Sequence, residues 1–152
     1  MKLVEGLLDY RNTEPGQIYA FTANSMIHAN KLCMGGGAAL AAREAYPHIC
    51  TILAEEITKV IFDDVYGSVV VPYHNFFVCA FQTKTHVMLP STLTLITAAC
   101  NELNRYLSTK YKDQEQPIVH LNYPGIGLGG LSPEEVGPII ESLLGDNIIV
   151  YK

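Results

Sequence analysis

A lysine follows an apolar segment near the middle of the chain, in the stretch FQTKTH. A lysine beside a closed crevice loses its proton more easily through desolvation, and the neutral amine can then act as a nucleophile. Lys84 is therefore the candidate catalytic residue. The alternative is a solvated lysine at the end of a strand, because most lysines are exposed. His86 could move a proton or contact a ligand, although a lone histidine in a loop more often has a structural role.

Two glycine-rich stretches are the second feature that could bind or position a ligand. CMGGGAALAAREAYP sets Gly35, Gly36 and Gly37 against an alanine run that favours a helix, and PGIGLGGLS follows an apolar segment later in the chain. Backbone amides at such a turn, where a helix begins, can bind an anion or a sugar. The alternative is a tight turn in which two backbones touch.

Several well-known sites do not fit this sequence. Gly125, Gly127 and Gly130 match the G-x-G-x-x-G pattern, but it comes late and no acidic residue follows at the distance that a dinucleotide-binding fold requires. No Lys-Ser or Lys-Thr follows a glycine as in a P-loop. The 4 cysteines are widely spaced without a C-x-x-C pair, and the 5 histidines are scattered. We therefore expect reduced core cysteines and no metal site.

Composition narrows the class of protein. The sequence of 152 residues is 49% hydrophobic and 16% charged, which predicts one domain over residues 1–152 with a substantial core. The formal charge of −5 argues against a broad nucleic-acid-binding surface. The start of the sequence is too short and too quickly charged for a signal peptide, and no apolar run reaches membrane-spanning length. These features predict a cytoplasmic protein without membrane contact.

The elements that must position these residues alternate between strand and helix. Strands are predicted over 2–8, 18–23, 68–71, 76–81, 117–123 and 147–151, with helices over 38–64 (interrupted at Pro47), 91–110 and 133–144 and a turn at Pro72–Asn75. This alternation predicts an α/β protein with three α/β/α layers around a mixed, largely parallel sheet. Ligands of such sheets bind beyond the carboxyl ends of the strands. Both glycine stretches follow a strand and precede a helix, so we expect them to meet there.

The segments FTANS, MGGGAALAAREAYP, FQTKTH and YPGIGLGGLSPEEV, in this order, resemble a macrodomain, the ADP-ribose-binding α/β/α module, over nearly the whole chain. The sequence is most similar to the branch that contains the glutamate-linked and DNA-linked ADP-ribose glycohydrolases, including the antitoxin that removes ADP-ribose from thymidine in DNA. That branch carries a Met-Gly-x-Gly-x-Ala turn, a Thr-Lys pair and a P-x-hydrophobic-Gly-x-Gly loop. All three are present here.

The resemblance implies roles for individual residues. Lys84 would attack the anomeric carbon of the distal ribose, and Asn24 would hydrogen-bond that ribose, unless Asn24 is only a turn residue. The implied ligand-binding residues are Gly35, Gly36, Gly37, Ala38, Gly125, Ile126, Gly127, Leu128, Gly129, Asp9 and His86. The implied partner is ADP-ribose, free or attached to a protein or to DNA, and the implied protein is a monomer that needs no cofactor.

The sequence departs from the family pattern in two ways that bear on function. Leu7 stands where the family has the Asp that binds the adenine amino group, so Asp9 would have to replace it. The catalytic Asp of the glutamate-specific enzymes has no counterpart, because Gly129 and Gly130 occupy that region, and Pro133 replaces a common tryptophan. Three hypotheses follow: an ADP-ribosyl glycohydrolase, a non-catalytic reader of ADP-ribose or a related nucleotide signal, and an ADP-ribose-1″-phosphate phosphatase.

Overall fold

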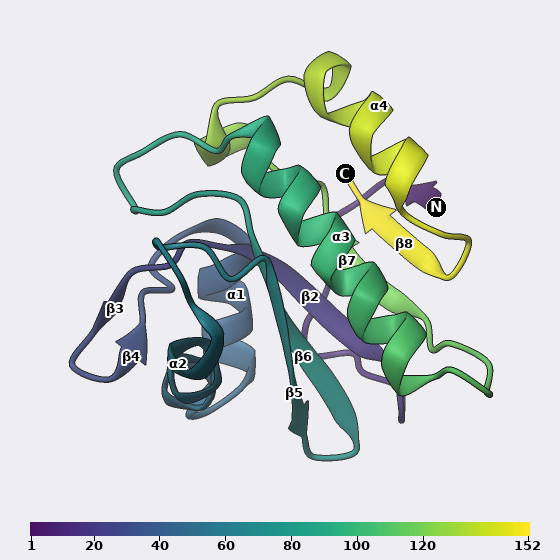
Figure 1. Cartoon of the computed structure of the whole chain (residues 1–152), viewed down its shortest axis with the longest axis horizontal. Coiled ribbons are helices and arrows are strands. Elements are labelled where there is room, and N and C mark those ends of the chain that lie inside the picture. Colours follow the sequence, from purple (N-terminus) through teal and green to yellow (C-terminus); the bar gives the residue numbers. More distant parts are fainter.

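The computed structural model describes residues 1–152 and shows a six-stranded sheet between two layers of helices (Figure 1). The strand order is β1-β8-β7-β2-β6-β5, and every neighbouring pair is parallel except β5 and β6. The strands of this sheet are β1 (Lys2–Val4), β2 (Ile18–Ala23), β5 (Ser68–Tyr73), β6 (Phe76–Gln82), β7 (Val119–Asn122) and β8 (Ile148–Tyr151). The predicted three-layer α/β/α architecture is confirmed.

Each face of the sheet has its own core. The helices are α1 (Gly37–Ala45), α2 (Ile49–Val60), α3 (Leu93–Lys110) and α4 (Pro133–Leu143). Side chains of α1 and α2 pack on one face of the sheet, and those of α3 and α4 pack on the other. Alternate residues of β2 serve the two cores, with Tyr19 under α1 and α2 and Ile18 under α3 and α4. The central strand is consequently buried on both sides, which explains its continuous apolar sequence.

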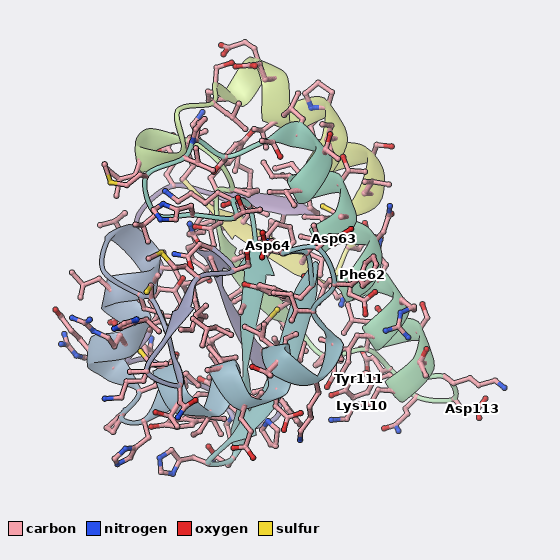
Figure 2. The ribbon with its side chains drawn as sticks, turned by 60° about the vertical axis from the view of Figure 1, so that its left-hand side comes forward. Phe62, Asp63, Asp64, Lys110, Tyr111 and Asp113 are labelled. Atoms are coloured by element: carbon pink, nitrogen blue, oxygen red, sulfur yellow. The ribbon has the colours of Figure 1, made fainter.

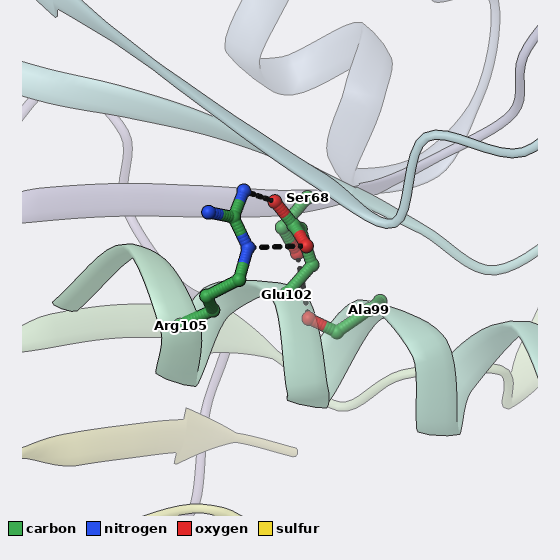
Figure 3. A network of polar contacts seen from close by, with 4 residues as sticks. All are labelled: Ser68, Ala99, Glu102 and Arg105. Atoms are coloured by element: carbon green, nitrogen blue, oxygen red, sulfur yellow. Dashed lines mark hydrogen bonds and ion pairs between the residues drawn. The ribbon is translucent and has the colours of Figure 1, made fainter. Parts of the chain in front are cut away.

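Polar contacts cap the start of α3 and join this helix to the sheet. Thr92 caps the helix by accepting a hydrogen bond from the Leu95 amide at 3.2 Å. The Ser68 hydroxyl of β5 donates to the Ala99 carbonyl at 2.9 Å, close to an ion pair between Glu102 and Arg105 (Figure 3). The Ser68–Ala99 bond holds α3 on the sheet, and the Thr92 amide, which donates to the Thr83 carbonyl at 3.0 Å, holds the start of α3 at the carboxyl end of β6.

The structure corrects the ends of two predicted elements and adds a hairpin that was not predicted. The first strand ends at Val4 rather than at residue 8, because Gly6 turns the chain with φ of +109°. The predicted interruption at Pro47 is confirmed, because α1 and α2 are separate helices on either side of it, but α2 ends at Val60 rather than at residue 64. A short hairpin of β3 (Ile27–His28) and β4 (Lys31–Leu32) was not predicted. Its turn has two residues with positive φ, and neither is the glycine that usually marks such a turn.

The connections of β2 and β7 leave the sheet in opposite directions. The chain passes from β2 to α1 on one face, and from β7 to α4 on the other. Such a switch point opens a crevice at the carboxyl ends of the two strands. Here the paired register of β2 and β7 stops at Ala20 and Leu121, and the Asn122 side chain then bonds the Thr22 amide at 2.9 Å and the Thr22 hydroxyl at 3.0 Å. No helix is long and apolar enough to cross a membrane.

Candidate functional site

A cavity of about 740 Å³ lies at the carboxyl ends of β2, β6 and β7, where the switch point predicts a crevice. Its volume falls within the range of roughly 300–1,000 Å³ that is common for small-molecule sites. The lining residues are Thr22, Ala23, Asn24, Cys33, Met34, Gly35, Gly36, Gly37, Ala38, Ala39, Arg43, Thr83, Lys84, Val87, Ser91, Asn122, Gly125, Ile126, Gly127, Leu128 and Gly129. The structure thus brings the two glycine stretches and the Thr-Lys pair to one cavity.

The first glycine stretch ends in a helix start that has no side-chain cap. Gly36 is the N-cap of α1, with extended backbone, and no side chain accepts a hydrogen bond from the first turn. The amides of Gly37, Ala38 and Ala39 therefore have no acceptor within the helix or from a cap. These amides and the positive end of the helix dipole lie at the cavity, where they favour an anionic group.

The second glycine stretch forms the opposite side of the cavity. Its residues 127–129 form a short 3-10 turn, and Gly125, Gly127 and Gly130 have φ of +81°, +65° and +80°. The internal hydrogen bonds of this loop use the amides of residues 129–131, so those of Ile126, Gly127 and Leu128 have no internal acceptor. A backbone with positive φ that presents several free amides is a recurrent binding concavity for anions.

Leu128 joins the two loops across the cavity. A Cβ atom built on Gly36 would lie 3.3 Å from the Leu128 Cδ1 atom, and one built on Gly37 would lie 3.7 Å from it. Leu128 is nevertheless 78% exposed. The Leu128 side chain therefore closes over Gly36, and a ligand that binds both loops must displace this exposed leucine.

Two hydrogen-bonded hydroxyl side chains line the cavity. The buried Ser91 hydroxyl donates to the Thr83 hydroxyl oxygen at 3.1 Å, and the Ser91 amide donates to the Gly129 carbonyl at 2.9 Å. A Cβ atom on Gly129 would come within 2.5 Å of the Ser91 Oγ atom. The close approach explains why glycine occupies this position, and it ties the second loop to the end of β6.

Lys84 and Arg43 are the charged residues of the cavity, and no carboxylate lines it. Lys84 is half-buried at the end of β6, takes part in no salt bridge, and donates from Nζ to the Val87 carbonyl at a long 3.4 Å. The bond is near the outer limit of hydrogen-bond length, so it holds the amine weakly. A cavity with two cations and no acid, in a chain of net charge −5, attracts an anionic ligand.

Asn24 lies in the wall of the cavity and closes a loop. Its Oδ1 atom accepts from the Met26 amide at 2.9 Å, and its Nδ2 atom donates to the Cys33 carbonyl at 3.1 Å. The Tyr66 hydroxyl donates to the Asn24 carbonyl at 2.7 Å, and burial raises the pKa of Tyr66 well above its ordinary value, so Tyr66 remains a neutral donor. These bonds give Asn24 the turn role that the sequence left open, and leave one Nδ2 hydrogen for another partner.

Asp9 and His86, which were predicted to bind the ligand, do not line this cavity. Asp9 lies in the exposed segment after β1, where its carboxylate accepts a hydrogen bond from the Arg11 amide at 3.0 Å. Leu7 is 96% exposed and also lies outside the cavity. The exposed His86 accepts from the Met88 amide through Nδ1 at 3.0 Å, and it lines a second, adjoining cavity.

Five polar residues of the cavity were not among the predicted site residues: Thr22, Arg43, Thr83, Ser91 and Asn122. Arg43 lies on α1 and looks like an ordinary surface residue in the sequence. Asn122 and Thr22 are far apart in the chain and meet only because β2 and β7 are neighbours. Their hydrogen bond is a property of the sheet order, and the only sequence signal was an asparagine at the end of an apolar strand.

Solved structures with the same arrangement of elements identify the fold. The macrodomain of Mycobacterium tuberculosis DarG matches with a TM-score of 0.70 over 98% of this chain and 96% of its own, at 21% identity. The chain has the macrodomain fold. The macrodomain of Thermus aquaticus DarG matches with a TM-score of 0.69 over 99% of this chain and 95% of its own, at 21% identity. The resemblance read from the motifs is confirmed for the fold.

A longer solved protein contains the same macrodomain fold. Thermosipho africanus DarTG, solved in complex with ADP-ribose, matches over 90% of this chain and 38% of its own, with 20% identity and a TM-score of 0.66. A scan of the sequence against protein-family models gives no match, and a search of curated proteins finds no relative. The structural similarity therefore rests on the arrangement of helices and strands in this macrodomain fold.

Proposed function

We propose that the protein binds ADP-ribose in the 740 Å³ cavity and hydrolyses an ADP-ribosyl linkage with Lys84 as nucleophile. The observation that carries the proposal is the meeting of two sets of free backbone amides, at the start of α1 and at residues 126–128, in a cavity with two cations and no carboxylate. A diphosphate is the anion that suits such a surface, because its oxygens can accept several amide hydrogen bonds at once. The ADP-ribose complex of a structural neighbour supports this choice.

The proposed orientation follows from the same residues. The diphosphate lies between the backbone of Gly36 and that of Leu128, where both amide sets can reach it, and it displaces the exposed Leu128 side chain. The distal ribose lies toward Asn24 and Lys84, in the wall between β2 and β6. The free Nδ2 hydrogen of Asn24 can then donate to a ribose hydroxyl.

In the proposed reaction, the Lys84 amine gives a proton to water and then attacks the C1″ atom of the distal ribose. A bond forms between Nζ and C1″, the bond from C1″ to the attached group breaks, and the attached group leaves with that electron pair and receives the proton that the amine releases. Water then hydrolyses the lysine adduct, which frees ADP-ribose and restores the amine. Before attack, Lys84 has only the 3.4 Å bond to the Val87 carbonyl to give up.

Two substitutions of Lys84 separate chemistry from binding. Lys84→Ala is expected to abolish release of ADP-ribose while ADP-ribose affinity stays within a few-fold, because the amine acts mainly in the transition state. Lys84→Arg is not expected to restore activity, since a guanidinium keeps its charge at working pH and cannot attack. Turnover is followed as ADP-ribose released from ADP-ribosylated protein, ADP-ribosylated DNA and ADP-ribose-1″-phosphate. Full activity of Lys84→Ala would refute the nucleophilic role.

A binding module is the second candidate, and one observation favours it. No carboxylate lines the cavity, so no acidic side chain there can serve as general base for water. A reader of ADP-ribose needs only the amides, the cations and the shape of the cavity. Tight ADP-ribose binding without release from any of the three substrates would establish the reader and exclude the hydrolase.

A further inference from the structure

A second cavity of about 550 Å³ adjoins the first at the carboxyl ends of β2 and β6. It is lined by Ser25, Met26, Ile27, Asp64, Thr85, His86 and Leu89. The two cavities share a wall made of consecutive residues, with Asn24 and Lys84 on the first side and Ser25 and Thr85 on the second. The Ser25 hydroxyl donates to the Thr85 carbonyl at 3.2 Å, so the wall is braced from the second side.

The position of this wall assigns a role to the second cavity, given the proposed function. The distal ribose lies against Asn24 and Lys84, and the group attached at its C1″ atom must extend away from the diphosphate. The second cavity begins directly behind this wall, because Ser25 and Thr85 line it. It is therefore the place for the macromolecule that carries the ADP-ribose.

The chemistry of the second cavity distinguishes between classes of macromolecule. Three of its side chains are apolar, namely Met26, Ile27 and Leu89, and no lysine or arginine lines it. Asp64 contributes a carboxylate from the turn after α2, where its φ is +62° and the Gln82 side chain holds its carbonyl at 2.7 Å. The Asp64 carboxylate takes part in no salt bridge.

A nucleic acid would find little to bind there. Affinity for a nucleic acid comes mainly from lysine and arginine that neutralise phosphates, and each nucleotide beside a modified base carries one such charge. The second cavity instead offers Asp64, and Asp63 and the exposed Phe62, which precede it in the turn after α2, do not line the cavity (Figure 2). A peptide with a basic side chain can place its apolar atoms against the apolar residues and its charge near Asp64.

We propose that the second cavity receives a peptide segment of an ADP-ribosylated protein, with a lysine or arginine beside the modified residue paired to Asp64. This inference rests on the proposed binding of ADP-ribose in the first cavity. An exposed ion pair of this kind is expected to change affinity by about two- to fivefold. The pairing sets substrate preference, whereas the ADP-ribose itself is held by the first cavity.

The test measures affinity in the Lys84→Ala background, so that it works whether or not the protein is an enzyme. Two peptides with the same ADP-ribosyl linkage, one with Lys and one with Glu beside the modified residue, are compared by calorimetry with an ADP-ribosylated oligonucleotide. The Lys peptide is expected to bind several-fold more tightly than the Glu peptide and the oligonucleotide. Free ADP-ribose is titrated in parallel.

Asp64→Asn removes the charge and keeps the shape, and asparagine tolerates the positive φ of this turn. It is expected to abolish the preference for the Lys peptide without changing affinity for free ADP-ribose. Asp113→Asn is the matched control, because Asp113 lies beyond the far end of α3 (Figure 2) and is expected to leave the preference intact.

Each contrary outcome has one meaning. Equal affinities for the two peptides, a preference unaffected by Asp64→Asn, or tighter binding of the oligonucleotide would overturn the inference while free ADP-ribose still binds. Failure of free ADP-ribose to bind would overturn the proposed function, and this inference with it.

Discussion

Replacing Gly36 by valine should block the cavity without unfolding the protein. Gly36 has φ of −154° and ψ of 162°, which is extended backbone that valine adopts without strain. Its new Cβ atom would lie 3.3 Å from the Leu128 Cδ1 atom, and Leu128 is exposed and free to move. Loss of glycine at the N-cap lowers the free energy of unfolding by about 1 kcal/mol. Valine also makes the unfolded chain less flexible, which raises the free energy of unfolding by about 0.4–1 kcal/mol.

The expected change in the free energy of unfolding is therefore under about 1 kcal/mol for Gly36→Val. Binding should suffer far more, because the valine methyl groups occupy the space that the diphosphate would enter once Leu128 has moved aside. We expect ADP-ribose affinity to fall by about a hundredfold, or roughly 2.8 kcal/mol. Urea unfolding gives the first quantity and calorimetry the second.

Gly145→Val is the control, because Gly145 lies in the loop after α4, away from the cavity, and its φ is not in the left-handed region. It should leave ADP-ribose affinity unchanged. Unaltered affinity in a folded Gly36→Val protein would refute the placement of the diphosphate between Gly36 and Leu128.

Three further predictions concern adenine recognition, thiol reactivity and pH. Leu7 cannot accept a hydrogen bond and Asp9 does not line the cavity, so ADP-ribose and its inosine counterpart should bind with similar affinity. Asp9→Ala should change neither affinity. A strong preference for the adenine form would contradict this prediction. Cys33 lines the cavity and is half-buried, so saturating ADP-ribose should slow its reaction with a thiol reagent, and an unchanged rate would place the ligand elsewhere. Burial lowers the pKa of His120, so the unfolded chain binds a proton at this histidine before the folded protein does as pH falls. The free energy of unfolding should therefore decline below about pH 6.5. Urea unfolding between pH 7 and pH 5 should show a smaller decline for His120→Gln.

The elements with strong local patterns could be predicted from the sequence. Ser132, Pro133 and Glu135 form a capping box with a proline in the first turn of α4, and all these contacts lie within four residues. The same holds for Thr92 at the start of α3. The meeting of the glycine loops was also predictable, because strand-loop-helix order places both at the carboxyl edge of a largely parallel sheet.

Features that depend on distant contacts could not be predicted. The β3–β4 hairpin has a two-residue turn of Ala29 and Asn30, both with positive φ, where a glycine would have given the usual signal. Leu128 reaches Gly36 only because two loops from opposite halves of the sequence face each other. The second cavity likewise combines residues from three loops, and its Asp64 belongs to a turn that the sequence pattern assigned to a helix.

Amide chemical-shift mapping with ADP-ribose tests the central claim most directly. In a two-dimensional spectrum of the nitrogen-labelled protein, titration with ADP-ribose should shift the amides of residues 36–39 and 126–128, which have no internal acceptor in this structure. Amides of the β5–β6 turn at His74 and Asn75, at the opposite edge of the sheet, should not move. A spectrum that does not change, or changes that avoid both glycine loops, would contradict ADP-ribose binding in this cavity.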